Sequence, residues 1–270
     1  MAETKQTEIV GVRCPKGCET IMTGSTGAVY GFEDRPDVVV KLPYETDRHK
    51  ARFDTEKAIF RRLGSHPHIV PCLGIEDNDR GGRIYMARAK HTAIRGYFRE
   101  GGTASQAERV RWCRDLAAAV HYIHDKGVRW GDIGGRNILF TADRNIWICD
   151  FAGSGLDGAP PIVWGEDGFR HPDDESPETS TGTMPCEIHA LGSAMYELIT
   201  SKCPHWKEEA ECRGRAAGLL RRGVYPDVSD VALGDVIQRC WKGEYTSARE
   251  VAEGIEEKVL LSLSSLWDSQ

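Results

Sequence analysis

Two loop segments that carry oxygen-bearing side chains constrain this chain more than any other feature. The first, 129–140, places Asp132 and Asn137 five residues apart on a Gly-rich stretch that runs into an apolar, strand-like segment. Eighteen residues after Asp132, a second short strand-like run ends at Asp150. Carboxylate and amide oxygens are the groups that bind hard cations or accept protons. The spacing therefore predicts that all three side chains point into one cleft.

The first 90 residues are predicted to be mostly strand with one helix. Strand-type runs cover 28–32, 38–42, 69–75 and 84–89, and polar turns separate the members of each pair. Residues 48–63 follow a helical spacing instead, and Gly64 is a suitable residue to end that helix.

The remainder of the chain is predicted to be mainly helical. Ser105 and Glu108 form a capping-box pattern before a helix that Gly127 ends. Residues 153–183 lack any period and are rich in Gly, Pro, Asp, Ser and Thr, which indicates a long functional loop. Further helices are expected at 187–200, 208–222 and 231–241.

The two acidic loops resemble those of the protein-kinase family. The sequence W-G-D-I-G-G-R-N is similar to the catalytic-loop pattern H-R-D-L-x-x-x-N, and D-F-A-G is similar to the metal-binding D-F-G. The resemblance implies that Asp132 is the catalytic base and that Asn137 and Asp150 bind Mg²⁺. It also places Arg136 in the catalytic set, at the position it has in the tyrosine-kinase pattern D-L-A-A-R-N.

The N-terminal part resembles the ATP-binding half of the same family. The segment 21–30 is similar to the glycine loop G-x-G-x-x-G-x-V, with Met22 at the first glycine position, and V-V-V-K is similar to V-A-I-K. Lys41 would then bind the α- and β-phosphates, and Glu56 would hold Lys41 by an ion pair. The nucleotide-contacting residues that the resemblance implies are Gly24, Ser25, Thr26, Gly27, Val29, Lys41, Met86, Ala87 and Ala89.

Downstream, 187–198 resembles the F-helix pattern D-x-x-A-L-G-x-x-x-Y-E-L, and 203–206 and 237–241 resemble later kinase segments. The likeness covers about residues 18–257. It implies an α+β, bilobal protein-kinase-like fold. Residues 1–88 would form a small, mostly β N-terminal lobe with one C-helix, and residues 89–270 a larger α-helical C-terminal lobe. The combination of motifs is similar to compact kinase-like proteins of filamentous fungi.

Several positions depart from the family pattern. Trp130 and Gly131 replace the His and Arg before the catalytic base, so the usual phosphate-receiving Arg is missing. We expect Trp130 to fill an apolar column beneath Phe151. Ala152 replaces the Gly of D-F-G, which predicts less switching of the metal loop without loss of metal. The A-P-E motif has two candidates, 171–173 and 176–178, and the sequence does not choose between them.

Composition limits the remaining function classes. A net charge of −6 and a pI near 5.9 give no broad basic field for nucleic acid, and no apolar run approaches the roughly 20 residues needed to span a bilayer. Nine cysteines, an odd number, suit reduced thiols in an intracellular, cytoplasmic protein. Cys14 and Cys18 lack the further ligands that zinc requires and are taken as incidental thiols.

The function expected from these motifs is transfer of the γ-phosphoryl group of Mg-ATP to a protein hydroxyl, with ATP and a protein substrate as partners. The sequence does not decide between a Ser/Thr and a Tyr acceptor. Gly134 stands where serine/threonine kinases usually have Lys, whereas Arg136 matches the tyrosine-kinase pattern. The alternative is a pseudokinase that binds ATP or scaffolds with little catalysis, which Met22, Trp130 and Gly131 favour. A small-molecule kinase of the aminoglycoside type is a third possibility, which the F-helix pattern opposes.

Overall fold

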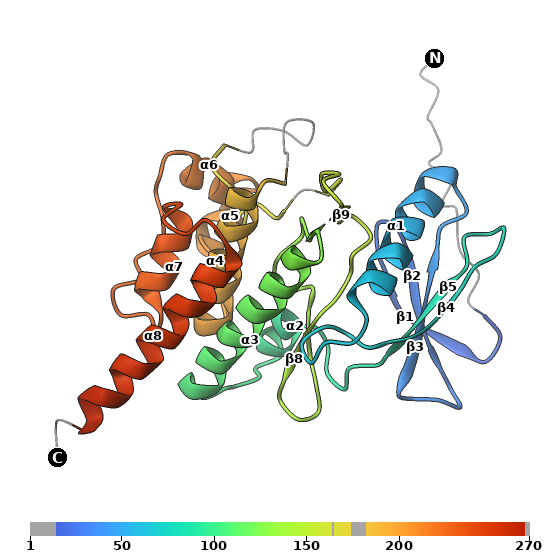
Figure 1. Ribbon diagram of the computed structural model, residues 1–270, viewed down its shortest axis with the longest axis horizontal. Helices are drawn as coiled ribbons and strands as arrows, with labels where there is room; N and C mark the ends of the chain where they lie inside the picture. Colours follow the sequence, from blue (N-terminus) through green and yellow to red (C-terminus); the bar gives the residue numbers. More distant parts are fainter. Residues whose placement is uncertain (1–14, 164, 174–181, 268–270) are drawn as a thin grey trace. The chain divides into compact units, whose positions relative to one another are not determined.

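The computed structural model describes residues 15–163, 165–173 and 182–267. These residues form two compact units (Figure 1). One comprises the described residues up to Gly64 together with Pro71–Arg88, and the other comprises Ser65–Val70 and the described residues from Ala89 onward. The segment Ser65–Val70 belongs to the second unit because Val70 donates a backbone hydrogen bond to Ile148, whose N–H in turn bonds His68.

The N-terminal unit is built on a five-stranded antiparallel sheet with the order β1-β2-β3-β5-β4. Its strands are β1 Cys18–Thr23, β2 Gly27–Phe32, β3 Val38–Pro43, β4 Cys72–Glu76 and β5 Arg83–Ala87. Ala28, Tyr30 and Val40 are buried together at the centre of this sheet. Because side chains alternate along a strand, Lys41 on β3 points to the face opposite Val40.

Helix α1, Asp47–Leu63, completes this unit. Thr46 accepts a hydrogen bond from the N–H of His49 and so caps its first turn, and Gly64 ends it with a φ of 61° that suits glycine. Its buried face carries Phe53, Ile59, Phe60 and Leu63, with the carboxylate of Glu56 among them. The predicted helix at 48–63 and its stop at Gly64 are confirmed.

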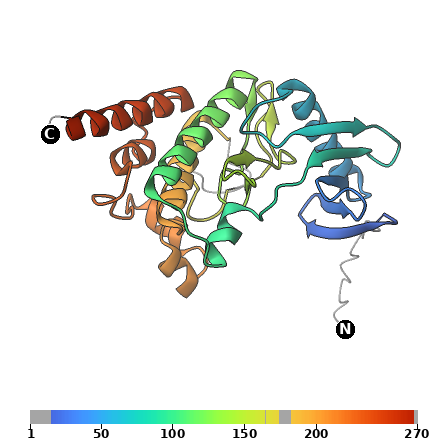
Figure 2. The same ribbon diagram turned by 90° about the horizontal axis from the view of Figure 1, so that it is seen from below.

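The C-terminal unit is mainly helical (Figure 2). Its helices are α2 Ile94–Arg99, α3 Gln106–Asp125, α4 Met184–Thr200, α5 Trp206–Glu211, α6 Arg215–Arg221, α7 Gly234–Trp241 and α8 Ala248–Trp267. Helix α3 packs against α4 and α8, and α4 packs against α7. The predicted capping box is present, because Ser105 and Glu108 exchange both of its hydrogen bonds. The α+β, kinase-like division into a β-rich part and a helical part is confirmed.

Two short hairpin-like ladders position the loops that carry the acidic residues. Strand β7, Ile138–Phe140, pairs with β8, Ile146–Ile148, and β6, Val128–Arg129, pairs with β9, Gly155–Leu156. The loop that contains Asp132 lies between β6 and β7, and Asp150 lies between β8 and β9. Both ladders are antiparallel, so the chain segments that leave them are brought together in space.

Some predicted boundaries are wrong. The strand expected from Ile69 begins at Cys72, because Ile69 and Val70 pair with Ile148 of β8 instead, within the C-terminal unit. The helix expected at 208–222 is two helices, since Gly214 has a φ of 84° that no α-helix contains. The last predicted helix starts at Gly234, three residues later than expected. Strand β1 and helix α8 were not predicted.

Glycine is required where α4 crosses α7. A Cβ added to Gly192 would lie 2.6 Å from Cβ of Cys240, closer than two such atoms approach, so the two backbones are in near contact there. No described helix is both long enough and apolar enough to cross a lipid bilayer.

We predict that Gly192→Ala destabilises the protein by about 1–3 kcal/mol, because the added methyl overpacks the α4–α7 crossing. Gly218→Ala is the matched control. It lies within helix α6, where the new Cβ would meet only Arg222 at 3.7 Å, so alanine should stabilise by about 0.5–1 kcal/mol. Denaturant unfolding measures both changes, and destabilisation of equal size in the two variants would contradict the predicted clash.

Candidate active site

A buried ion pair joins the sheet and the helix of the N-terminal unit. Nζ of Lys41 on β3 lies 2.8 Å from Oε1 of Glu56 on α1, and the side chains are 8% and 1% exposed. The low exposure decides its importance, because a pair removed from water and salt holds a more definite geometry than a surface pair. The predicted Lys41–Glu56 ion pair is present.

The predicted glycine loop is a tight hairpin turn between β1 and β2. The N–H of Gly24 donates to the carbonyl of Gly27 at 2.8 Å, and the hydroxyl of Tyr44 donates to the carbonyl of Gly24 at 2.9 Å. A Cβ on Gly27 would collide with the carbonyl oxygen of Leu42 on β3, so glycine is required there. Met22, at the first glycine position of the pattern, lies on β1 and is 55% exposed.

The C-terminal unit brings Asp132, Arg136 and Asn137 together. The amide nitrogen of Asn137 donates to Oδ2 of Asp132 at 2.8 Å and to its backbone carbonyl at 2.9 Å, and Arg136 forms an ion pair with Oδ1. Because the amide nitrogen is used to fix the loop, the amide oxygen of Asn137 is the atom that remains for a cation. The proximity predicted for Asp132 and Asn137 is therefore observed.

Asp150 lies at the same end of the β7–β8 ladder as Asn137. Ile138 pairs with Ile148, and the N–H of Cys149 donates to the carbonyl of Asn137 at 3.0 Å, so the residues just outside both strands are neighbours. Asp150 has a φ of 61°, a left-handed conformation that is uncommon outside glycine and occurs often at functional sites. A carboxylate and an amide oxygen from these two residues fit Mg²⁺, which prefers oxygen ligands.

The catalytic loop is held from below by Glu187 near the start of α4. Its two carboxylate oxygens accept the backbone N–H groups of Trp130, at 2.8 Å, and Gly131, at 2.7 Å, and one of them also contacts Nε2 of His124 at 3.1 Å. Charged acceptors make strong hydrogen bonds to the backbone in a buried setting. Glu187 belongs to the predicted F-helix pattern, but nothing in that pattern indicates these hydrogen bonds.

Trp130 packs where it was predicted to pack and also acts as a donor. It is fully buried, and its ring centroid lies 6.2 Å from that of Phe151. Its indole N–H points at the carbonyl oxygens of Cys149, at 3.2 Å, and Asp150, at 3.1 Å. The side chain therefore links the catalytic loop to the backbone of the proposed metal ligand.

The backbone conformation and the surroundings of Gly131 leave no room for an arginine side chain. Its φ is 77°, and a Cβ there would lie 2.5 Å from Cβ of Pro161 and 3.1 Å from Cγ2 of Val163. The segment after β9 thus occupies the space that a side chain would need. Ala152 is tolerated for the opposite reason, because its backbone does not adopt a positive φ and the methyl group is buried.

Comparison with known proteins identifies the family. The protein kinase domain model matches residues 18–222, which is most of the chain and includes both acidic loops. The chain belongs to the protein kinase domain family. The matched range contains both acidic loops, Lys41 and Glu56, whose roles in the chemistry stay predictions.

Curated relatives of this kinase domain are distant. A rice protein, salt tolerance receptor-like cytoplasmic kinase 1, is 28% identical over 227 residues, which is 77% of this chain and 60% of that protein. Serine/threonine-protein kinase mos of Patiria pectinifera is 24% identical over 92% of this chain and 74% of its own length. PknD of Mycobacterium tuberculosis is 29% identical, and the match spans only 32% of it.

An ion-pair network that sequence reasoning missed ties the 165–170 segment to the catalytic loop of the kinase domain. Arg95 on α2 binds Glu197 on α4 through two hydrogen bonds and binds Glu166 through a third. Arg136 contacts the other oxygen of Glu166, and Glu197 accepts the N–H of Gly135 at 2.9 Å. Nothing local in the sequence signals these contacts, because their partners lie up to 102 positions apart.

Burial and charge act in opposite directions on these carboxyl groups. Burial raises the pKa of Asp132 above its ordinary value, although Arg136 and the hydrogen bond from Asn137 oppose the shift. Burial also raises the pKa of Glu166, but the positive charges and hydrogen bonds of Arg95 and Arg136 together outweigh burial, so its pKa is lowered. Asp132 is therefore the better proton acceptor, and Glu166 is a persistent anion.

Other predicted positions stay predictions. Asp150 belongs to the unit that does not contain Lys41, and their convergence on one nucleotide is inferred from the family. The same is true of nucleotide contacts by Met86, Ala87 and Ala89, which lie where the chain passes from one unit to the other. Of the two A-P-E candidates, 171–173 lies within the described residues, whereas 176–178 falls outside them.

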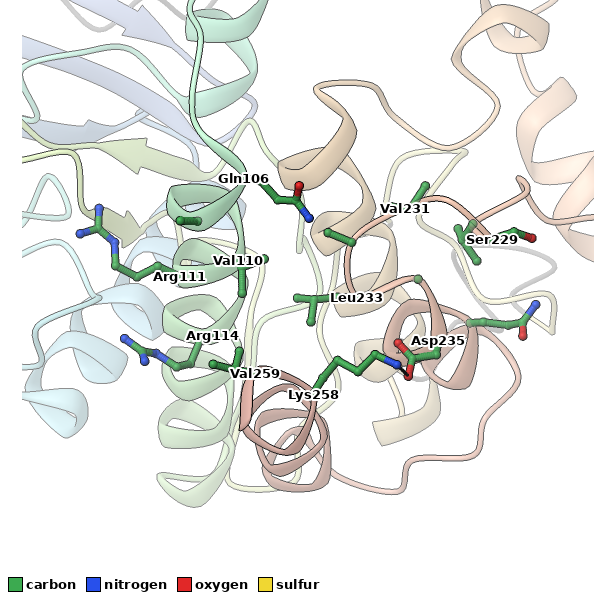
Figure 3. Close-up of a pocket in the computed structure, with 15 residues that line it drawn as sticks. Gln106, Val110, Arg111, Arg114, Ser229, Val231, Leu233, Asp235, Lys258 and Val259 are labelled. Atoms are coloured by element: carbon green, nitrogen blue, oxygen red, sulfur yellow. Dashed lines mark hydrogen bonds and ion pairs between the residues drawn. The ribbon is translucent and has the colours of Figure 1, made fainter. Parts of the chain in front are cut away.

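A cavity of about 810 Å³ is lined by none of the predicted site residues. It is lined by α3, the segment 228–233, α7 and α8, with Val110 and Leu233 facing one another and the Lys258–Asp235 ion pair at one side (Figure 3). Its size exceeds that of the cavity beside the catalytic loop, of about 590 Å³. Volume alone therefore does not locate the chemistry of this domain.

We predict that Trp130→Phe weakens binding of Mg²⁺-nucleotide about three- to tenfold, because Phe keeps the ring but leaves the carbonyls of Cys149 and Asp150 without their donor. Trp112→Phe is the control. Trp112 is equally buried and donates to the carbonyl of Arg144 at 2.8 Å, away from the metal loop. Both variants should lose stability, but titration calorimetry should find altered nucleotide affinity in Trp130→Phe alone. Equal affinities for all three proteins would refute the positioning role.

Proposed function

We propose that this kinase domain transfers the γ-phosphoryl group of Mg-ATP to a hydroxyl group of a protein. The observation that carries the proposal is the arrangement of Asp132 and Asn137, in which one amide nitrogen fixes the carboxylate and leaves an oxygen for a cation. A loop with a purely structural role has no need for a partly buried carboxylate, a held amide and a nearby Asp150 in a left-handed conformation. The intact Lys41–Glu56 pair adds support from the other unit.

Each side chain has a distinct part in this reaction. Asp132 accepts the proton of the acceptor hydroxyl as its oxygen attacks the γ-phosphorus, and its raised pKa improves it as a base. Lys41, oriented by Glu56, neutralises the α- and β-phosphates. Asn137 and Asp150 would hold Mg²⁺, which neutralises charge on the phosphate oxygens when bound. Trp130 and Glu187 keep the two loops in register while this happens.

We propose a serine or threonine hydroxyl as the acceptor. Two of the relatives, mos and PknD, are named serine/threonine-protein kinases, which supports this acceptor class over tyrosine. Arg136, the residue that resembles the tyrosine-kinase pattern, is already bound to Asp132 and Glu166. Its presence is thus accounted for by the loop structure without a tyrosine substrate.

A transfer assay with Asp132→Asn tests the function. With generic protein substrate and Mg-ATP, wild-type protein should transfer phosphate, and Asp132→Asn should be slower by about 10²-fold or more because the general base is lost. Intact-protein mass and phosphoamino-acid analysis identify the product. No transfer by the wild type, or equal transfer by both proteins, would contradict the proposal, and the former result together with nucleotide binding would favour a pseudokinase.

Glu166 supports activity that does not depend on phosphorylation of the loop 151–172. In the family, an activation-loop phosphate is received by the Arg that precedes the catalytic Asp, and this chain has Gly131 there. Glu166 supplies a fixed negative charge that engages Arg95 and Arg136 instead. A carboxylate of the chain itself therefore does the work that a phosphate does elsewhere.

We predict that phosphatase-treated wild type keeps its initial rate within about twofold, whereas Glu166→Gln loses about tenfold, which corresponds to roughly 1.4 kcal/mol. Glu100→Gln is the control, because Glu100 is exposed just beyond α2 and forms no ion pair within the described part of the chain. The assay needs a kinase-free preparation and a correction for rephosphorylation. A tenfold drop after dephosphorylation, restored by phosphate on this loop, would show that another cation receives it.

A further inference from the structure

A cavity of about 590 Å³ opens beside the catalytic loop within the C-terminal unit. It lies between α2, the segment 165–170, and α5 with the loop that follows it. Arg136 both lines this cavity and pairs with Asp132, so the cavity is adjacent to the catalytic base. A peptide whose hydroxyl lies at Asp132 can therefore extend into it. The charged residues that line it are Arg95, Arg99, Arg136, Arg170, Arg213, Glu166, Asp167 and Glu209.

Every carboxylate that lines the described cavity already has partners. Glu166 lies between two arginines, Arg95 and Arg136. Asp167 pairs with Arg170 at 2.7 Å, and Glu209 accepts the N–H groups of Gly214, at 2.8 Å, and Ala216, at 3.0 Å. A lysine or arginine of a substrate would have to displace one of these contacts. The cavity is therefore poorly suited to basic side chains.

Among the described residues, two arginines that line the same cavity form no ion pair with its carboxylates. Arg99, at the end of α2, and Arg213, between α5 and α6, are exposed, and neither has a hydrogen bond or ion pair of its side chain within the part of the chain that the structure describes. The positive charge of Arg213 acts on Asp167. Burial and the neighbouring Glu209 raise the pKa of Asp167 above its ordinary value, and Arg170 and Arg213 only partly oppose that shift. Arg213 is also one of the residues that line the cavity.

We propose that Arg99 and Arg213 select protein substrates that carry an acidic side chain close to the acceptor hydroxyl. Arginine suits this role because its planar guanidinium forms paired, charge-assisted hydrogen bonds with carboxylate and phosphate groups. The selection opposes the net charge of −6 of the chain and so depends on the local excess of guanidinium at this cavity. This inference rests on the proposed kinase function and adds the class of substrate to it.

The anionic group can be an aspartate or glutamate or a residue that is already phosphorylated. Both present oxygen acceptors to a guanidinium, but a phosphate carries close to two charges. A preference for phosphoserine over glutamate of about tenfold or more at the same peptide position would identify a previously phosphorylated substrate. Comparable rates for the two would identify an ordinary acidic segment, and either result supports the inference.

A set of serine peptides with one varied flanking position at a time tests the selection. At one or more positions, Glu should be phosphorylated about five- to twentyfold faster than Gln, and Lys more slowly than Gln. The double variant Arg99→Gln/Arg213→Gln should reduce the Glu-to-Gln ratio below about twofold. Arg221→Gln should leave the ratio unchanged, because Arg221 is exposed on the neighbouring helix α6 but does not line the cavity.

In a protein that transfers phosphate, equal rates for Glu and Gln at every position, a preference for Lys, or an unchanged ratio in the double variant would each overturn the inference. The two single variants, each checked for normal thermal unfolding, replace the double variant if that protein does not fold. Transfer without acidic preference would leave the proposed kinase function intact.

Binding of the labelled Glu and Gln peptides to wild type and to the double variant, without nucleotide and followed by fluorescence anisotropy, separates the two proposals. Acidic-peptide binding that depends on Arg99 and Arg213, in a protein that transfers no phosphate, would uphold this inference and reject the kinase function. If no phosphate is transferred, equal binding of the two peptides to wild type would reject the inference.

Discussion

Two carboxylates of the buried helix α4 hold the catalytic loop by its backbone. Glu187 accepts the N–H groups of Trp130 and Gly131 on one side of Asp132, and Glu197 accepts that of Gly135 on the other. Buried carboxylates are costly unless they are paired, and here His124 and Arg95 provide the partners. Helix α4 packs against α3 and α7, so the hydrogen bonds from its two carboxylates connect the catalytic loop to the helical core. The backbone on both sides of Asp132 is thereby fixed, and the carboxylate of Asp132 is not needed to stabilise the loop.

The departures from the family pattern fit this framework. Trp130 exchanges an ionisable ring for an indole, yet it still fills the space against Phe151 and donates to the carbonyl of Asp150. Gly131 lacks the positive charge that the family has at this position, and Pro161, which follows β9, occupies the space that a side chain there would need. Two other arginines, Arg95 and Arg136, form ion pairs with Glu166 of the 165–170 segment. The same neutralisation that anchors the 165–170 segment also leaves Arg99 and Arg213 as the cations available to a substrate.

Much of the local structure could be predicted because its causes are local. Ser105 and Glu108 are three residues apart and form their capping box regardless of the rest of the fold, and Gly64 ends α1 through its own backbone conformation. The five-residue spacing of Asp132 and Asn137 likewise fixes one short loop. The predicted boundary of a strand was wrong where a residue pairs with a distant segment, because Ile69 pairs with Ile148 and does not extend β4. The single helix predicted at 208–222 was wrong because the positive φ of Gly214 divides it into two helices.

The sequence by itself determined the family of this protein and predicted its Lys–Glu pair, its catalytic base and its metal ligands, because those residues stand at short, fixed spacings in recognisable motifs. Only the tertiary structure decided what neutralises each buried charge. Arg95 and Glu197 are 102 positions apart, Arg95 and Glu166 are 71, and no periodicity links them. Ion pairing depends on distance in space and on burial, both of which folding sets, so which arginines remain for a substrate is a property of the folded chain.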